Sequence, residues 1–277
     1  MFEAILLLAA LGFIFGLGLF IASKKFAVET DPRIEEIADI LPGANCGACG
    51  RTGCFNFAEA LVHGSDEVGQ CAANSAEDRC RIATILGVEL SDEGEKKVAV
   101  VLCQGARAVE KYRYAGIKEC RAAALIHGGQ KECAYGCLGF GTCVAACPFG
   151  AITMRDGLPV IDEERCTACG KCVSVCPHQL IEIHPVSHSV FVKCKSKDLG
   201  KIVNKICDTG CIACKKCEKE CPVDAIHVEN KLAVIDYEKC TACGKCVKVC
   251  PNNTIVTYRK ERKEREKALK ETQAANA

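Results

Sequence analysis

Residues Cys240 to Pro251 read CTACGKCVKVCP. The spacing of this stretch, Cys-x2-Cys-x2-Cys-x3-Cys-Pro, is typical of chains that wrap a [4Fe–4S] cluster, with three cysteines on one cluster and the fourth on a neighbouring cluster. The same spacing recurs from Cys166 to Cys176 and from Cys211 to Cys221. Three such runs in one chain predict several iron–sulfur sites whose ligands cross between paired runs.

The runs belong to an internal repeat with a period of 74 residues. Nine cysteines keep this register: Cys120, Cys133, Cys137, Cys143, Cys147, Cys166, Cys169, Cys172 and Cys176 map onto Cys194, Cys207, Cys211, Cys217, Cys221, Cys240, Cys243, Cys246 and Cys250. Between paired runs, alternating apolar segments at 152–161 and 226–235 predict β-hairpins. We therefore expect two tandem bacterial-type two-[4Fe–4S] ferredoxin modules, at residues 98–190 and 191–257.

The crossing rule assigns ligands in the regular runs. It places Cys211, Cys214, Cys217 and Cys250 on one cluster and Cys221, Cys240, Cys243 and Cys246 on its neighbour. In the first copy it places Cys147, Cys166, Cys169 and Cys172 together. The last set lacks a thiolate, because Phe140 stands where the second copy has Cys214. Cys133 precedes Cys137 by four residues, so we expect Cys133, Cys137, Cys143 and Cys176 to complete it.

Five cysteines remain outside these sets and the N-terminal motif described next. Cys103 and Cys194 each follow a strand-like apolar segment, and together with Cys120 and Cys207 they form a candidate sixth cluster joining the two copies. The alternative is that these four are buried free thiols. Cys80 lies in an expected helix and is interpreted as a buried free thiol.

A different cysteine motif precedes the repeat, in an expected small helical domain at residues 30–86. Cys46, Cys49, Cys54 and Cys71 follow the spacing Cys-x2-Cys-x4-Cys-x16-Cys, with glycines between the first three. Glycine lets a backbone turn its N–H groups toward cluster sulfurs, which favours a fifth [4Fe–4S] cluster. Structural zinc is the alternative, although zinc sites usually combine two separated Cys-x2-Cys pairs.

The N-terminal residues have a different composition. Every residue from Ala4 to Ala22 is apolar or glycine, which is long enough to span a bilayer. Lys24 and Lys25 follow this segment and no basic residue precedes it, so we expect a single-pass anchor at residues 1–25 with the iron–sulfur domains in the cytoplasm. The expected fold is therefore α+β: one transmembrane helix, a small helical Fe–S domain and two ferredoxin modules.

Composition narrows the possible functions. The 277 residues include 25 cysteines, 36 basic and 35 acidic residues, giving a net charge of +1 and no electrostatic basis for nucleic-acid binding. No dinucleotide fingerprint is present and no catalytic constellation stands out, so no catalytic residue is assigned. The tail at residues 258–277 is rich in charge and is expected to be a solvated or frayed helix.

The combination of motifs resembles the B subunit of the Rnf electron-transport complex in its longer polyferredoxin form. The resemblance rests on the apolar N-terminus, the Cys46 to Cys71 motif, the stretches Val101–Gly105 and Tyr135–Cys143, and the tandem runs. It implies a cell-membrane complex that couples electron flow between reduced ferredoxin and NAD to Na⁺ or H⁺ translocation. In such a complex this chain would accept electrons from ferredoxin, with flavin-containing and membrane-embedded subunits as partners.

A second function remains open: a stand-alone, membrane-tethered polyferredoxin that donates electrons to a redox regulator or another enzyme. Co-purification with other subunits would distinguish the two.

Overall fold

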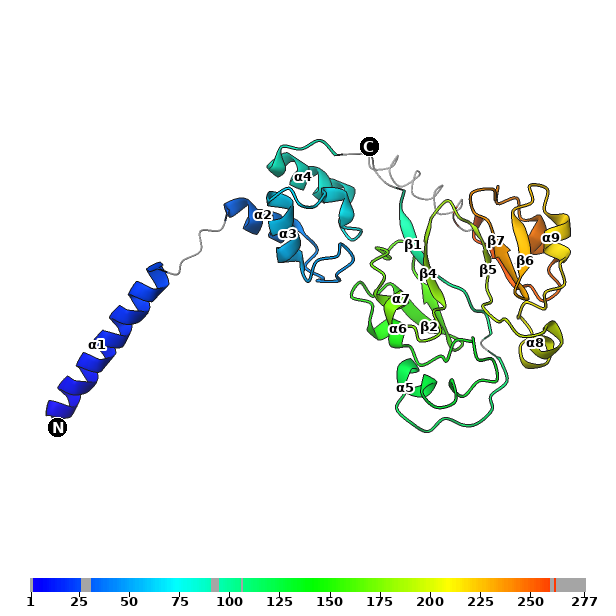
Figure 1. Cartoon of the computed structure of the whole chain (residues 1–277), viewed down its shortest axis with the longest axis horizontal. Helices are drawn as coiled ribbons and strands as arrows, with labels where there is room; N and C mark the ends of the chain where they lie inside the picture. The colour runs from blue at the N-terminus through cyan, green and yellow to red at the C-terminus, as the bar shows by residue number, and fades with distance from the viewer. Residues whose placement is uncertain (1, 26–30, 91–94, 106, 260–261, 263–277) are drawn as a thin grey trace, which may run out of the picture.

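The structure is a computed structural model that describes residues 2–25, 31–90, 95–105, 107–259 and 262. Its first helix, α1 (Phe2–Lys25), carries no basic residue before Lys24 and lies apart from the other helices (Figure 1). Its large apolar side chains are exposed, among them Phe13 and Leu19, each 72 % exposed. Among the helices as described, none is long and apolar enough to cross a membrane, so the expected transmembrane span is not confirmed.

A small helical domain follows, built from α2 (Pro32–Ile40), α3 (Cys54–Val62), the 3-10 turn η1 (Val68–Gln70) and α4 (Ala76–Leu86). Asp31 caps α2 by accepting the backbone N–H of Arg33, and Ser75 caps α4 in the same way through Asp78. The buried faces of the helices meet around Ile37, Phe57 and Ile82. This core holds the ends of the loops that carry the N-terminal cysteines.

The first ferredoxin module begins with β1 (Lys97–Val101) and ends with β4 (Ile181–Pro185), which pairs with β1 in an antiparallel ladder. Between them lie α5 (Cys120–Ala124), α6 (Thr142–Ala145), β2 (Ile152–Arg155), β3 (Leu158–Ile161) and α7 (Lys171–Val175). The predicted hairpin at 152–161 is confirmed as β2 paired with β3.

The second module repeats this plan. β5 (Val190–Val192) pairs with β8 (Ile255–Thr257), and the predicted hairpin at 226–235 is confirmed as β6 (Ile226–Glu229) paired with β7 (Leu232–Ile235). The helices are α8 (Gly200–Ile206), α9 (Lys216–Glu220) and α10 (Lys245–Val249). β5 begins one residue before the expected module boundary at 191.

The two modules pack against each other through their terminal strands. In β1, Ala99 and Val101 face the core of their own module, whereas Val98 and Val100 join Phe191 of β5 in a separate shared core. This alternation is what a strand buried on both faces requires. The side chain of Phe191 is fully buried there.

The start of the tail is anchored at one described position. Arg262 is buried and pairs with Glu163 of the first module at 2.8 Å, and it also donates to the carbonyl oxygens of Val186 and His188. The expectation of a solvated tail is therefore wrong at this residue, because Arg262 is buried and its charge is paired with Glu163 inside the fold. Residues 260–261 and 263–277 lie outside the described residues.

Candidate metal centres

Five cavities in the two modules share one property: each is lined by four cysteines. They enclose about 320–440 Å³ of space each. The sets are Cys120, Cys137, Cys143 and Cys176; Cys147, Cys166, Cys169 and Cys172; Cys103, Cys133, Cys194 and Cys207; Cys211, Cys214, Cys217 and Cys250; and Cys221, Cys240, Cys243 and Cys246. Four-thiol sets are the ligand complement of a [4Fe–4S] cluster.

The regular runs form their cavities through a repeated backbone conformation. Ala168, Ala213 and Ala242, each directly before the second cysteine of its run, have φ between 52° and 56°. Such left-handed positions curl a short loop around its own centre, at a cost that tertiary contacts must offset. Three sets predicted by the crossing rule are thereby brought together as expected.

The crossing cysteines receive a matching set of hydrogen bonds. Cys147, Cys176, Cys221 and Cys250 each accept the backbone N–H of the residue four positions later, at 3.3–3.4 Å from N to Sγ. An N–H···S bond stabilises the thiolate form of a cysteine and tunes any cluster bound to it. All four crossing positions therefore share one local geometry.

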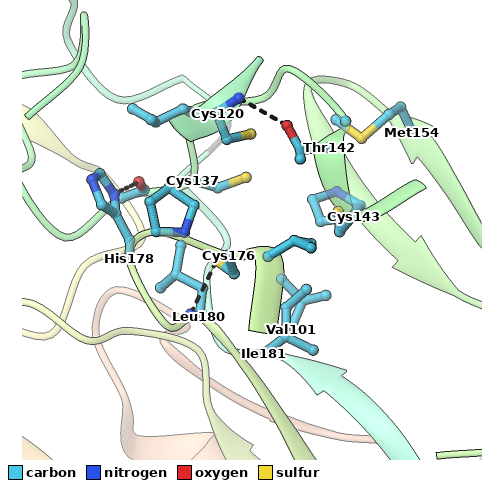
Figure 2. Close-up of a pocket in the computed structure, with 16 residues that line it drawn as sticks. Val101, Cys120, Cys137, Thr142, Cys143, Met154, Cys176, His178, Leu180 and Ile181 are labelled. Atoms are coloured by element: carbon cyan, nitrogen blue, oxygen red, sulfur yellow. Dashed lines mark hydrogen bonds between the residues drawn. The ribbon is translucent and has the colours of Figure 1, made fainter. Parts of the chain in front are cut away.

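The irregular first run keeps the backbone of its counterpart but not its thiolate. Gly139 and Gly141, which occupy the repeat positions of Ala213 and Lys215, are left-handed with φ of 80° and 73°. The missing fourth thiol comes from Cys120, at the start of α5, whose backbone N–H donates to Thr142 Oγ1 at 2.8 Å. Figure 2 shows Cys120 beside Cys137, Cys143 and Cys176 around one cavity.

This arrangement corrects the expected ligand set, because Cys133 does not line that cavity. Cys133 instead joins Cys103, Cys194 and Cys207 at the junction of the two modules, in the place expected for Cys120. The physical reason is the anchoring of α5 onto the run through Thr142, which fixes Cys120 on the first-module side. Proximity in sequence was a poor guide, since Cys133 lies four positions before Cys137 and yet lines the other cavity.

The 74-residue register does not by itself identify the two sets. It maps Cys133 onto Cys207, and both line the junction cavity, but it also maps Cys120 onto Cys194, which lines the junction cavity while Cys120 lines the first-module cavity. Gly105 lies in the wall of the junction cavity, where a Cβ would stand 3.1 Å from Cys207 Sγ and 3.8 Å from Cys103 Sγ. Only glycine leaves room for the backbone to pass so close to the two sulfurs.

The N-terminal motif gathers in the helical domain. Cys71 is buried, and Cys49 and Cys54 pack against the same core. Burial raises the pKa of Cys71, and the nearby thiols of Cys46 and Cys49 raise it further. Asn45 holds the loop by accepting the backbone N–H of Cys54 at 2.7 Å. The four predicted residues therefore lie in one region of this domain.

Cys80 lines none of the five cavities. It lies on α4 as expected, but its side chain is exposed rather than buried, which corrects the interpretation of Cys80 as a buried thiol. The surface of α4 explains this, since Ile82 and Ala83 occupy its buried face.

The electrostatics of the cavities fit a cationic cluster core. Burial raises the pKa of Cys137 and of Cys172 to about 12, and neighbouring thiols add to both shifts. Four thiolates in such a place repel one another unless iron neutralises them, so the donor sets suit the group. These sets are distinct from sites for a single metal ion: among the described residues, no three or more His, Cys, Asp or Glu side chains are placed so that they could hold one.

The fold and the cavities define an electron-transfer protein of the polyferredoxin class. Family models match the chain as "Putative Fe-S cluster" at residues 41–73, "4Fe-4S dicluster domain" at 132–180 and 165–225, and "4Fe-4S binding domain" at 233–256. These matches show that the chain carries several [4Fe–4S] clusters of the ferredoxin type.

The relatives are subunits of one kind of complex. The chain is 49 % identical over 236 residues to the B subunit of the Na(+)-translocating ferredoxin:NAD(+) oxidoreductase complex of Acetobacterium woodii, covering 84 % of this chain and 71 % of the relative. It is 46 % identical over 240 residues to the B subunit of the ion-translocating oxidoreductase complex of Methanosarcina acetivorans, covering 86 % and 90 %. It is 44 % identical to the B subunit of the proton-translocating ferredoxin:NAD(+) oxidoreductase complex of Clostridium ljungdahlii, covering 84 % and 83 %. The chain belongs to this family of B subunits of the Rnf complex, which confirms the resemblance seen in its motifs.

Proposed function

We propose that the chain binds six [4Fe–4S] clusters and relays electrons within an ion-translocating ferredoxin:NAD oxidoreductase complex. The five four-cysteine cavities carry this proposal, and Cys46, Cys49, Cys54 and Cys71 provide the sixth ligand set. When bound, each cluster exchanges one electron. The protein contributes the thiolates, and N–H···S bonds to the four crossing cysteines.

The cysteine sets adjoin one another in a continuous order, which suits a relay. The junction set consists of the four cysteines that line the cavity between the two modules, and Cys194 is one of them. Cys194 lies close to Cys211 of the second module. Burial raises the pKa of Cys194 to about 11, and the charge of Cys211 adds to this shift. On the other side, Cys137 donates its backbone N–H to Cys103 Sγ at 3.5 Å. The junction set therefore stands between the second module and the first.

The relay continues toward the N-terminal domain. Within the first module, the charge of Cys143 adds to the shift of Cys172, whose pKa is raised chiefly by burial. Cys169 of the same set lies close to Cys46, whose charge adds to the burial that raises the pKa of Cys169. These contacts link five of the six sets, from the set of Cys211 to the domain that follows α1. The sixth set, to which Cys221 and Cys246 belong, packs in the same core as Cys211 and Cys217.

The donor and the acceptors follow from the relatives. Two of them are named as subunits of ferredoxin:NAD(+) oxidoreductase complexes, so reduced ferredoxin is the proposed donor and other subunits, including flavin-containing ones, are the proposed acceptors. The absence of a dinucleotide fingerprint in the sequence supports NAD binding elsewhere in the complex.

Membrane attachment is proposed through α1. The exposed apolar side chains of this 24-residue helix and the basic pair Lys24 and Lys25 at its end support an anchor in the cell membrane, with the iron–sulfur domains on the cytoplasmic side. Deleting residues 1–25 is expected to release a brown, cluster-bearing protein from membranes. Full retention of the truncated chain on membranes free of partner subunits would contradict this attachment.

The relay is tested on the full chain purified without oxygen in detergent. Six clusters predict about 24 iron and 24 sulfide per chain, and ferredoxin reduced by a catalytic system is expected to bleach the visible absorption of all of them. Cys80→Ser serves as the control and leaves the iron content unchanged. A brown protein that ferredoxin does not reduce would refute the proposed donor.

A further inference from the structure

The two ferredoxin modules differ in how far their cysteine sets are exposed. Of the 24 cysteines in the six sets, Cys214 and Cys243 are the two exposed ones, and both belong to the second module. An exposed ligand marks the place where a partner protein comes closest to a cluster, and electron transfer requires such an approach. The second module is therefore the open end of the chain of sets.

The first module covers both equivalent positions. Phe140 replaces Cys214 in the repeat register, and its ring lies against Tyr114, with 5.2 Å between the ring centroids. Cys169, the counterpart of Cys243, is half-buried and lies near Cys46 of the N-terminal domain. The two repeat positions that are exposed in the second module, Cys214 and Cys243, are therefore covered in the first module.

Lysines surround the open positions of the second module. Lys216 and Lys219 lie on α9, and Lys245 and Lys248 lie on α10, which packs against α9. All four side chains are exposed, and they form what we name the α9–α10 lysine face. The helices α9 and α10 begin two residues after Cys214 and Cys243, respectively, so the face borders both exposed thiols.

The repeat shows that this face is particular to the second copy. The counterparts of the four lysines in the first copy are Thr142, Ala145, Lys171 and Ser174, a single lysine among four residues. Ferredoxin geometry around the clusters is preserved without the other three lysines, so they are not needed to build the fold.

Acidic residues do little to offset this charge. Glu218 is half-buried; its Oε2 accepts the backbone N–H of Val228 in β6 at 3.0 Å and its Oε1 pairs with Lys215 at 3.9 Å, while Glu220 of the same helix is exposed. Residues 191–257 contain 12 lysines and eight acidic residues, a net charge of +4. Residues 31–86 contain four arginines and nine acidic residues, a net charge of −5. An acidic protein is therefore attracted to the second module and repelled by the N-terminal domain.

We propose that the α9–α10 lysine face is the docking surface for an acidic electron-carrier protein, and that it is where ferredoxin binds. This inference rests on the proposed function, since it places the donor on one face of the chain. The lysines steer the carrier and orient it over Cys214 and Cys243.

Binding is measured with an oxidised, acidic two-[4Fe–4S] ferredoxin as the probe and the full holoprotein in detergent, by calorimetry at low and high salt. The test variant is Lys216→Gln, Lys219→Gln, Lys245→Gln and Lys248→Gln. The matched control removes four exposed lysines elsewhere: Lys118→Gln, Lys201→Gln, Lys205→Gln and Lys231→Gln. Both variants lose the same charge and are expected to keep the wild-type iron content.

The test variant is expected to bind ferredoxin about tenfold more weakly at low ionic strength, with the difference disappearing at high salt. The control variant is expected to stay within about twofold of the wild type. Equal weakening of both variants, or none in the test variant, would overturn the docking surface. Binding of both variants to vesicles of anionic phospholipid is measured as well. If the test variant loses binding to these vesicles but keeps wild-type binding to ferredoxin, the docking surface is also overturned, because the face would then contact a membrane.

Together with the reduction assay described above, the binding experiment separates failure of the donor from failure of the docking surface. If reduced ferredoxin fails to reduce the wild-type clusters, the proposed donor is wrong and the docking surface falls with it. If wild-type reduction is normal and the test variant binds ferredoxin as the wild type does, the docking surface alone is wrong.

Discussion

The structure places Cys120 in the first-module set and Cys133 in the junction set, whereas the sequence predicts the reverse. Iron analysis of paired cysteine replacements can distinguish the two assignments. Single replacements do not distinguish them, because either assignment places both cysteines on some cluster. Pairs of replacements do, since two ligands lost from one cluster cost one cluster, whereas two ligands lost from different clusters cost two. Cys143 is the reference residue, because both assignments place it with Cys137 and Cys176.

In the structure, Cys120 and Cys143 line one cavity, whereas Cys133 lines the junction cavity. Cys120→Ala with Cys143→Ala is therefore expected to lower the iron content by about four per chain, and Cys133→Ala with Cys143→Ala by about eight, from a wild-type total of about 24. Metal and sulfide analysis of anaerobically reconstituted protein measures both losses.

Two controls make the comparison safe. Cys137→Ala with Cys143→Ala reports the loss of one cluster under either assignment, and circular dichroism reports whether each variant stays folded. The reverse pattern, with the larger loss in the Cys120 and Cys143 pair, would refute the structural sets and restore Cys133 to the first module. Equal losses of eight would mean that the two cavities assemble as one unit, because thiolate binding is coupled to folding.

Three further predictions follow from the packing. Gly105→Ala is expected to lower iron by up to about four per chain by crowding Cys207 and Cys103, whereas Gly69→Ala, with nothing within 4 Å of its Cβ position, leaves the metal content unchanged. Phe191→Ala is expected to destabilise the module junction by about 3–5 kcal/mol in chemical unfolding, because it empties the shared core, and the exposed Val234 provides the control as Val234→Ala. Arg262→Met is expected to remove the buried ion pair between Arg262 and Glu163 and to lower the unfolding midpoint, whereas Arg259→Met, at an exposed position, changes the midpoint little. An unfolding midpoint equal to that of the wild type in the Phe191 or Arg262 variant would show that the contact contributes nothing to the folded state.

Local sequence determined the parts of this protein that are built from neighbouring residues. Each regular run from Cys166, Cys211 or Cys240 fixes its own loop, because three ligands and the left-handed residues between them lie within eleven positions. The hairpins β2–β3 and β6–β7 were predictable for the same reason, since a short turn sets their register. The family resemblance followed from these local motifs as well.

Tertiary structure alone decided which distant segments meet. β4 and β8 were not predicted, since each is a short strand whose partner lies more than 60 residues earlier in the chain. The placement of Cys120 and Cys133 was equally hidden, because the segment between Val101 and Cys137 carries no spacing rule that ties a cysteine to either cavity. Long segments can close on either site at similar entropic cost. The choice therefore fell to contacts that exist only in the folded chain, the bond from Cys120 to Thr142 and the close passage of Gly105 past Cys207.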